Sequence, residues 1–215
     1  MKLVIVLIIL ASGFQYSTSQ NIYQKSYGNR SEQAKFNDGI TTNDGGLILT
    51  GSFEDNLLLL KLNNSGDTLW TKFYRSDFWE KDIGVSVRQT SDDGYIVLAN
   101  TYQGVSGYGI YLIKTDSLGD TLWTKMYTSN NSREIAYSIE NSTDRGYIIY
   151  GASGSSNLSP TLTKLDSNGV IIWAKRYESN ADGYYIDNKD FDLTNDGGYT
   201  ILVYVFKRRW AGRLI

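Results

Sequence analysis

The sequence predicts an all-β protein, a propeller-like array of about four repeats of a four-stranded antiparallel blade. Two recurring motifs carry this prediction: a hairpin that contains a tryptophan and a turn that contains Asp-Gly or a close variant, and they alternate along the chain. The composition agrees, because 17 tyrosines, 21 glycines and a single proline suit many short strands joined by tight turns.

The hairpin motif occupies residues 61–74, where it ends Asp-Thr-Leu-Trp-Thr-Lys-Phe-Tyr, and it recurs over residues 114–127 and 164–177. Its tryptophans, Trp70, Trp123 and Trp173, are 53 and 50 residues apart. A shorter copy begins at Tyr23, which takes the tryptophan position, and ends at Tyr27. Recurrence at one template position predicts that the indole rings pack in the core or between neighbouring blades.

The turn motif is followed each time by an apolar run, as in Asp-Gly-Tyr-Ile-Val. Its last glycines are 48, 52 and 52 residues apart, at Gly46, Gly94, Gly146 and Gly198. Aspartates at turns usually bond their own backbone, so for Asp116, Asp120 and Asp166 in the hairpin turns we expect a structural role rather than calcium binding. For the aspartates of the turn motif we expect a structural role rather than catalysis. The aspartates aligned with this turn are Asp44, Asp93, Asp144 and Asp196.

Each repeat divides into four expected strands. Strand A carries the tryptophan, strand B precedes the Asp-Gly turn, strand C follows it, and strand D ends in the repeat lysine, as at Lys114. The repeats span roughly residues 23–67, 68–120, 121–169 and 170–215 within a domain of residues 20–215. If a blade runs B-C-D-A, the copy at residues 23–27 completes the last blade and closes a four-bladed ring. The alternative is that the chain is a piece of a longer propeller.

The first 19 residues have the features of a signal peptide. Lys2 precedes an apolar run of nine residues, and small residues (Ser17, Ser19) stand before Gln20. Because a membrane-spanning helix needs about 20 apolar residues, we expect cleavage, no stable membrane span, and a secreted, extracellular or cell-surface location.

The pattern Asp-Gly-Gly-Tyr-Ile…Lys-Leu-Asp-x-x-Gly-Asp-x-x-Trp-Thr-Lys-x-Tyr resembles the repeats of secreted β-propeller-like proteins of Bacteroidetes. The resemblance covers residues 23–215. It implies a propeller and export, and it implies no established activity.

The composition narrows the chemistry. Without histidine or cysteine, the chain lacks the side chains of Ser-His-Asp and Cys-His nucleophile systems and of ordinary zinc, copper or haem sites. We therefore expect no enzyme, no cofactor and no metal site. A net charge of −2 gives no electrostatic reason for a nucleic-acid partner. A carboxylate-dependent glycosidase or lyase is the alternative, with its acids among Asp187, Asp190, Asp192 and Asp196.

A binding site is expected where the copies differ. The B–C and D–A turns share one face of an up-and-down array and are nearly identical, whereas the A–B and C–D loops share the opposite face and vary. The function predicted is a non-enzymatic binding or scaffold module that contacts a protein or glycan through the varied face. A structural spacer within a larger surface protein is a further alternative. The candidate binding residues are Phe78, Trp79, Tyr102, Tyr108, Tyr184 and Tyr185.

Overall fold

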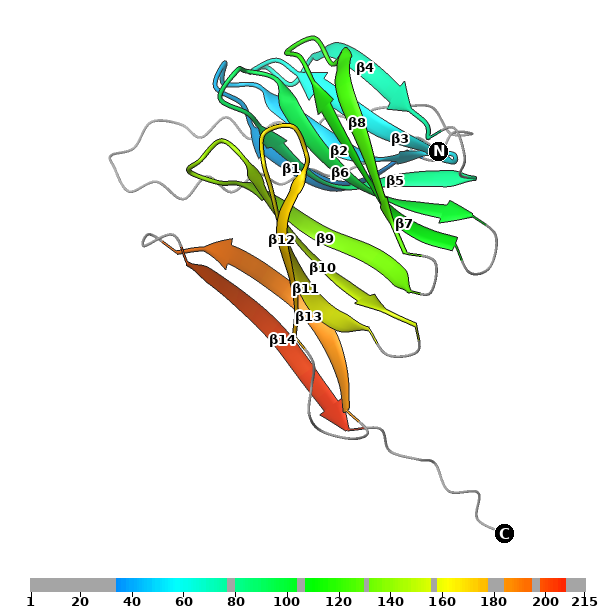
Figure 1. Ribbon diagram of the computed structural model, residues 1–215. Coiled ribbons are helices and arrows are strands. Elements are labelled where there is room, and N and C mark those ends of the chain that lie inside the picture. The colour runs from blue at the N-terminus through cyan, green and yellow to red at the C-terminus, as the bar shows by residue number, and fades with distance from the viewer. Residues whose placement is uncertain are drawn as a thin grey trace, which may run out of the picture.

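The computed structural model describes residues 34–76, 80–103, 107–129, 132–155, 158–177, 184–194 and 198–207. Within them, fourteen strands form three four-stranded antiparallel sheets and one two-stranded sheet, with no helix (Figure 1). The strands are β1 (Ala34–Thr41), β2 (Leu47–Phe53), β3 (Asn56–Leu62), β4 (Thr68–Tyr74), β5 (Lys81–Gln89), β6 (Tyr95–Gln103), β7 (Gly107–Thr115), β8 (Thr121–Thr128), β9 (Arg133–Asn141), β10 (Tyr147–Gly154), β11 (Ser159–Leu165), β12 (Ile171–Arg176), β13 (Tyr184–Leu193) and β14 (Tyr199–Lys207).

The sheets lie one after another in chain order, as stacked layers (Figure 1). Each four-stranded sheet is a simple meander whose strands follow in the order B-C-D-A. The all-β, propeller-like prediction is confirmed, and the described residues form an open array rather than a closed ring. The described residues contain no helix that is long and apolar enough to cross a membrane. The predicted signal peptide and the copy at residues 23–27 lie outside the described residues.

The middle strands of each sheet are buried on both faces, which explains their unbroken apolar runs. Along β6, Tyr95 and Val97 pack against the first sheet, whereas Ile96 and Leu98 pack against the third. Another cluster, which includes Tyr150 and Phe191, joins the third sheet to β13. A strand with one exposed face would alternate apolar and polar residues instead. The core is therefore a series of layers between sheets.

The recurrent tryptophans lie between sheets, as predicted. Trp70 meets Tyr95 of the next sheet with ring centroids 6.0 Å apart. Equivalent contacts join Trp123 to Tyr147 at 6.4 Å and Trp173 to Tyr199 at 6.1 Å. Edge and tilted ring contacts of this kind stabilise beyond the apolar area that they bury. The tryptophan thus makes the same packing contact at each interface between successive blades.

The first strand of each sheet lies innermost, and all four inner strands carry a β-bulge at the same place. The extra residues are Asn37 in β1, Val85 in β5, Tyr137 in β9 and Lys189 in β13. A bulge increases twist and re-aims side chains. Here it turns Asn37, Val85 and Tyr137 toward a shared central pocket.

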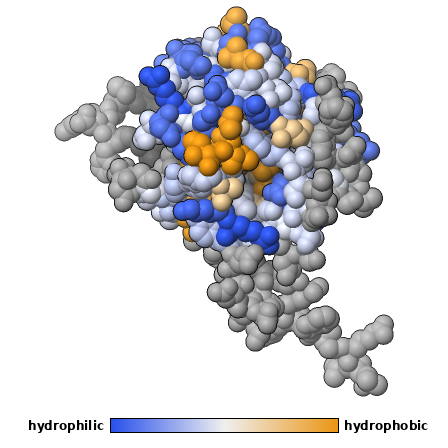
Figure 2. Space-filling view, viewed as in Figure 1, coloured by the Kyte–Doolittle hydropathy of each residue, from blue (hydrophilic) through white to orange (hydrophobic). Residues whose placement is uncertain are grey.

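The outer strands leave some apolar side chains exposed. A second recurrent bulge in β4, β8 and β12 places Leu69, Leu122 and Ile172 outside the ladder, each more than half exposed. The surface is otherwise largely hydrophilic to intermediate in the view of Figure 2, with a few hydrophobic patches between the hydrophilic regions.

Candidate binding surfaces

The meander topology separates two faces. The turns inside the β1–β2, β3–β4 and equivalent pairs lie on one face, here called the turn face. The loops within the β2–β3 and equivalent pairs, with those between sheets, lie on the opposite one, here called the variable-loop face.

On the variable-loop face, the structure brings two predicted binding residues together. Tyr102 near the end of β6 pairs in register with Tyr108 near the start of β7, and their rings meet edge-on with centroids 5.2 Å apart. The guanidinium carbon of Arg133, at the start of β9 in the third sheet, lies 5.4 Å from the centre of the Tyr108 ring. All three side chains are partly exposed. This tyrosine–arginine cluster therefore spans two sheets.

The cluster departs from the repeat. The same register positions hold Glu54 and Asp55 in the first sheet. In the third sheet they hold Gly154 and Leu158. A side chain that the scaffold does not need at this position is free to serve recognition, since binding residues concentrate on loops held by a rigid framework.

The electrostatics of the cluster keep Tyr102 neutral. Burial raises the pKa of its phenol, and the neighbouring Tyr108 and Tyr137 raise it further. Tyr137, the bulge residue of β9, is 37% exposed, and its ring lies 5.8 Å from that of buried Tyr150. At neutral pH, Tyr102 thus presents an O–H that can donate a hydrogen bond.

The other predicted residues are placed only in part. Tyr184 and Tyr185 begin β13, opposite Lys207 and Phe206 of β14, so their backbone lies at the variable-loop end of the array. Their side chains lie outside the described part of the structure, and Phe78 and Trp79 lie outside it altogether. Of the acids weighed for catalysis, Asp187, Asp190 and Asp192 belong to β13 but their side chains are not described, and Asp196 lies outside the described residues.

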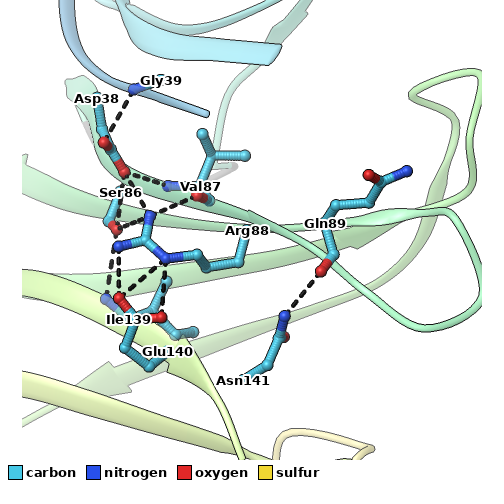
Figure 3. A network of polar contacts seen from close by, with 9 residues as sticks. All are labelled: Asp38, Gly39, Ser86, Val87, Arg88, Gln89, Ile139, Glu140 and Asn141. Atoms are coloured by element: carbon cyan, nitrogen blue, oxygen red, sulfur yellow. Dashed lines mark hydrogen bonds and ion pairs between the residues drawn. The ribbon is translucent and has the colours of Figure 1, made fainter. Parts of the chain in front are cut away.

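An arginine that sequence reasoning missed links three sheets beside the central pocket (Figure 3). Arg88 of β5 donates from Nη1 to Asp38 of β1 over 2.9 Å and from Nη2 to Glu140 of β9 over 2.5 Å. Asp38 also accepts from the Ser86 hydroxyl and the Val87 N–H. Burial opposes the charge on Arg88, but the hydrogen bond and charge of Glu140, with those of Asp38, outweigh it and raise the pKa of the guanidinium.

A signal for this contact exists in the repeat. Arg88 and Glu140 occupy the same register position in neighbouring sheets, where the first sheet has Ile40. Opposite charges at one template position of successive repeats predict an ion pair across the inner strands. The pocket beside it has a volume of about 220 Å³ and also touches Tyr150 and Phe191.

On the turn face, the repeat lysine is buried and locks the turn to strand D. In the second sheet, the Lys114 ammonium is bound by both carboxylate oxygens of Asp92 and by the Thr115 carbonyl, and its side chain is 6% exposed. Lys61 with Asp44 and Lys164 with Asp144 repeat the arrangement. The repeat position in the second sheet is therefore Asp92, and the alignment of Asp93 with Asp44 and Asp144 was wrong by one residue.

Asp93 has a different role. It occupies the left-handed backbone position of the turn, with φ = +59°, where the first sheet has Gly45 at +76° and the third has Arg145 at +67°. Two adjacent aspartates made either one fit the motif, and only the contact with Lys114 distinguishes them. The turns before strand A behave as expected for aspartate: Asp116 accepts from the Leu118 and Asp120 N–H groups, and Asp166 from those of Asn168 and Val170.

Comparison with known proteins supports the fold. No protein-family model matches the chain, and no curated protein matches it. The chain is similar to a crystal structure of a protein of unknown function from Bacteroides caccae, with a TM-score of 0.53 and 10% sequence identity. The alignment covers 78% of this chain and 52% of that one, so the chain spans about half the length of the Bacteroides protein. At this identity the likeness shows a shared fold alone.

Proposed function

We propose that this chain is a secreted, non-enzymatic, propeller-like module that binds a protein or a surface glycan through its variable-loop face. The observation that carries the proposal is the cluster of Tyr102, Tyr108 and Arg133, which two sheets assemble at positions where the repeat does not require it. Tyrosine and arginine are over-represented at binding hot spots, where a few side chains supply most of the affinity.

The cluster is held in place before any ligand arrives. In the same two strands, Thr101 next to Tyr102 is fully buried, and Ile110, two residues after Tyr108, is 8% exposed, so both strands are anchored in the core. The edge-on ring contact and the overlying guanidinium further restrict the rotamers of Tyr102 and Tyr108. Pre-organised aromatic side chains lose little conformational entropy on binding, which favours affinity.

The remaining parts of the proposal rest on the sequence. The absence of histidine and cysteine favours a binding role over catalysis, and the apolar run that follows Lys2 favours export. The repeated scaffold supplies rigidity and one face, the variable-loop face, on which loops can vary at little cost to the fold.

The test is a binding screen of the purified chain against immobilised bacterial surface glycans and extracellular proteins, followed by titration of any ligand found. The variant Tyr102→Ala/Tyr108→Ala should weaken binding by roughly 30-fold or more, the effect of losing a hot spot worth about 2 kcal/mol. Arg133→Gln, which keeps the length of the side chain but removes its charge, should also weaken binding.

The matched control is Leu118→Ala, which removes a 62%-exposed apolar side chain from the turn face. It should leave both binding and the thermal midpoint unchanged. Full-strength binding by the double tyrosine variant and by Arg133→Gln, with unchanged thermal midpoints, would exclude the variable-loop face as the contact surface.

A further inference from the structure

A cavity of about 710 Å³ opens on the turn face, between the second and third sheets. Its walls are the β5–β6 turn, the end of β7 and the start of β8 in the second sheet, and the β9–β10 and β11–β12 turns of the third. Asn43, from the β1–β2 turn of the first sheet, also lines it. The volume falls within the range typical of sites for small ligands, roughly 300–1,000 Å³. The cavity is distinct from the tyrosine–arginine cluster, which lies on the opposite face.

A side-chain bridge that joins the turn faces of the first and second sheets is missing between the second and third. Between the first and second sheets, the Asn43 N–H donates to the Gln89 side-chain oxygen over 2.8 Å, and the Asn43 amide group donates to Asp93 over 3.0 Å. One side chain thus spans the turn faces of both sheets.

At the next interface the equivalent residues differ. Ser91 stands in the place of Asn43, and its hydroxymethyl group is too short to span the gap. Asn141 takes the place of Gln89, and Arg145 takes the place of Asp93. The Asn141 amide still donates to the Gln89 carbonyl over 2.7 Å, which holds the inner strands together while the rim above them stays open.

Arg145 is an unusual residue for its position. Its φ of +67° lies in the left-handed region that glycine, asparagine and aspartate adopt most readily. Its side chain is exposed and lines the cavity. Within the described part of the chain, no ion pair engages its guanidinium. A long cation in a backbone conformation that suits glycine, with no ion-pair partner among the described residues, indicates a role in recognition.

The rest of the lining has the character of a saccharide site. The half-buried indole of Trp123 forms one wall, and neutral hydroxyl and amide groups surround it, from Ser91, Thr143, Asn141 and Asn168. Of the lining charges, Asp92 and Lys114 neutralise each other in their ion pair, which leaves Arg145 as the net charge. Aromatic rings stack on the apolar faces of sugars, amides and hydroxyls bond sugar hydroxyls, and guanidinium pairs with carboxylate in a bidentate geometry.

We propose that this cavity binds an acidic oligosaccharide, with a uronate carboxylate on Arg145 and a sugar ring against Trp123. An acidic peptide such as polyglutamate would satisfy Arg145 equally, and its backbone could bond the amides and hydroxyls, but it has no ring to lie against Trp123. The observations therefore favour the saccharide.

The experiment is isothermal titration calorimetry of the full chain with tetragalacturonate and tetramannuronate, beside a neutral tetrasaccharide and a hexaglutamate peptide. At least one uronate should bind saturably, and about tenfold or more tighter than the neutral sugar, because a charge-assisted hydrogen-bond pair is lost with the latter. Arg145→Gly, which restores the residue of the first sheet, should weaken uronate binding by a similar factor without lowering the thermal midpoint.

Two further variants separate this site from the variable-loop face. Ser91→Asn should refill the rim with the side chain that closes the preceding interface, and it should reduce uronate binding. Arg133→Gln should leave uronate binding unchanged, whatever its effect on ligands of the opposite face. The proposal would be overturned if neither uronate bound at millimolar concentration, or if Arg145→Gly bound as tightly as the unchanged chain. Hexaglutamate binding as tightly as the uronates would assign the cavity to acidic peptides and overturn it too.

Discussion

The hydroxyl of Tyr127, on the outer strand of the second sheet, donates a hydrogen bond of 2.6 Å to the carbonyl of Gly169 in a turn of the third sheet. Tyr74 makes the same contact with Gly119 one interface earlier, over 2.5 Å. Burial is the main cause that raises the pKa of both phenols far above the ordinary value, and nearby aspartates add to it, so both remain donors at any physiological pH. Each tyrosine lies four residues after the tryptophan of the same strand. Together the two side chains hold one sheet against the next.

Substitutions at the contact between Tyr127 and Gly169 should destabilise the protein, and the more disruptive substitution should cost more. Tyr127→Phe removes one hydrogen bond and should lower the free energy of unfolding by about 1 kcal/mol. Gly169→Ala should cost more, roughly 2 kcal/mol, because φ is +74° and the added Cβ would lie 2.9–3.0 Å from Lys125 and the Trp123 ring. Urea unfolding followed by tryptophan fluorescence measures both changes. Leu118→Ala serves as a surface control, and a cost for Gly169→Ala no larger than for this control would contradict the tight packing.

The buried lysines should depend strictly on their aspartates. Asp92→Ala leaves the Lys114 ammonium, in a residue only 5% exposed, without its counter-ion and should cost about 3 kcal/mol. Adding Lys114→Met to that variant removes the stranded charge and should recover part of the loss. A double-mutant cycle from urea unfolding measures the coupling energy of the two residues. Strictly additive effects of the two substitutions would show that the ion pair of Asp92 and Lys114 does not stabilise the fold.

The same locks predict a loss of stability in acid. Burial opposes ionisation of Asp92, but hydrogen bonds from Thr90 and Lys114 outweigh it and hold its pKa at about 2. The hydrogen bond from Lys61, followed by those from Thr42 and Gly46, holds the pKa of Asp44 still lower, and Lys164 does the same for Asp144.

A carboxyl with a lower pKa in the folded state stabilises the fold above its unfolded pKa, near 4, and loses that contribution as pH falls through the folded value. The urea midpoint should therefore fall steadily from pH 4 to pH 2. Because these carboxylates are about half exposed, 1 M salt should weaken the effect. Asp92→Asn should show a shallower fall, and a midpoint independent of pH in this window would count against the ion pairs.

Removing Arg88 alone should destabilise the protein more than replacing Arg88 and Glu140 together with apolar residues. Arg88→Met leaves two carboxylates, with side chains 26% and 24% exposed, without their shared cation and should cost about 3 kcal/mol. Arg88→Ile/Glu140→Ile should cost less, because the first sheet already carries Ile40 at that position and Asp38 keeps its bonds from Ser86 and Val87. Chemical unfolding of the two variants under identical conditions makes the comparison, and a larger loss in the double variant would show that the bridge is not the main interaction there.

The sequence predicted the strands well because their signals are local. An apolar run between glycine-containing turns specifies a strand wherever it occurs, and recurrence of Trp70, Trp123 and Trp173 at one template position indicated a shared environment between sheets. Alignment failed where two adjacent residues satisfied the same pattern, as with Asp92 and Asp93. The sequence predicted on which face the binding residues lie, but not that Tyr102, Tyr108 and Arg133 form a cluster. The contact of Tyr108 with Arg133 joins residues of different sheets, so it depends on how the sheets stack.

By itself, the sequence determined the repeating unit: four strands, tight turns that need positive φ, and a tryptophan that packs against the following unit. Only the tertiary structure decided what the units form together. It placed Arg88 between Asp38 and Glu140, and it opened a cavity where Ser91 replaces the bridging Asn43. The physical reason is that strands form through contacts between near neighbours in the chain, whereas a site between blades depends on side chains some fifty residues apart, whose approach is set by bulges and by the stacking of whole sheets.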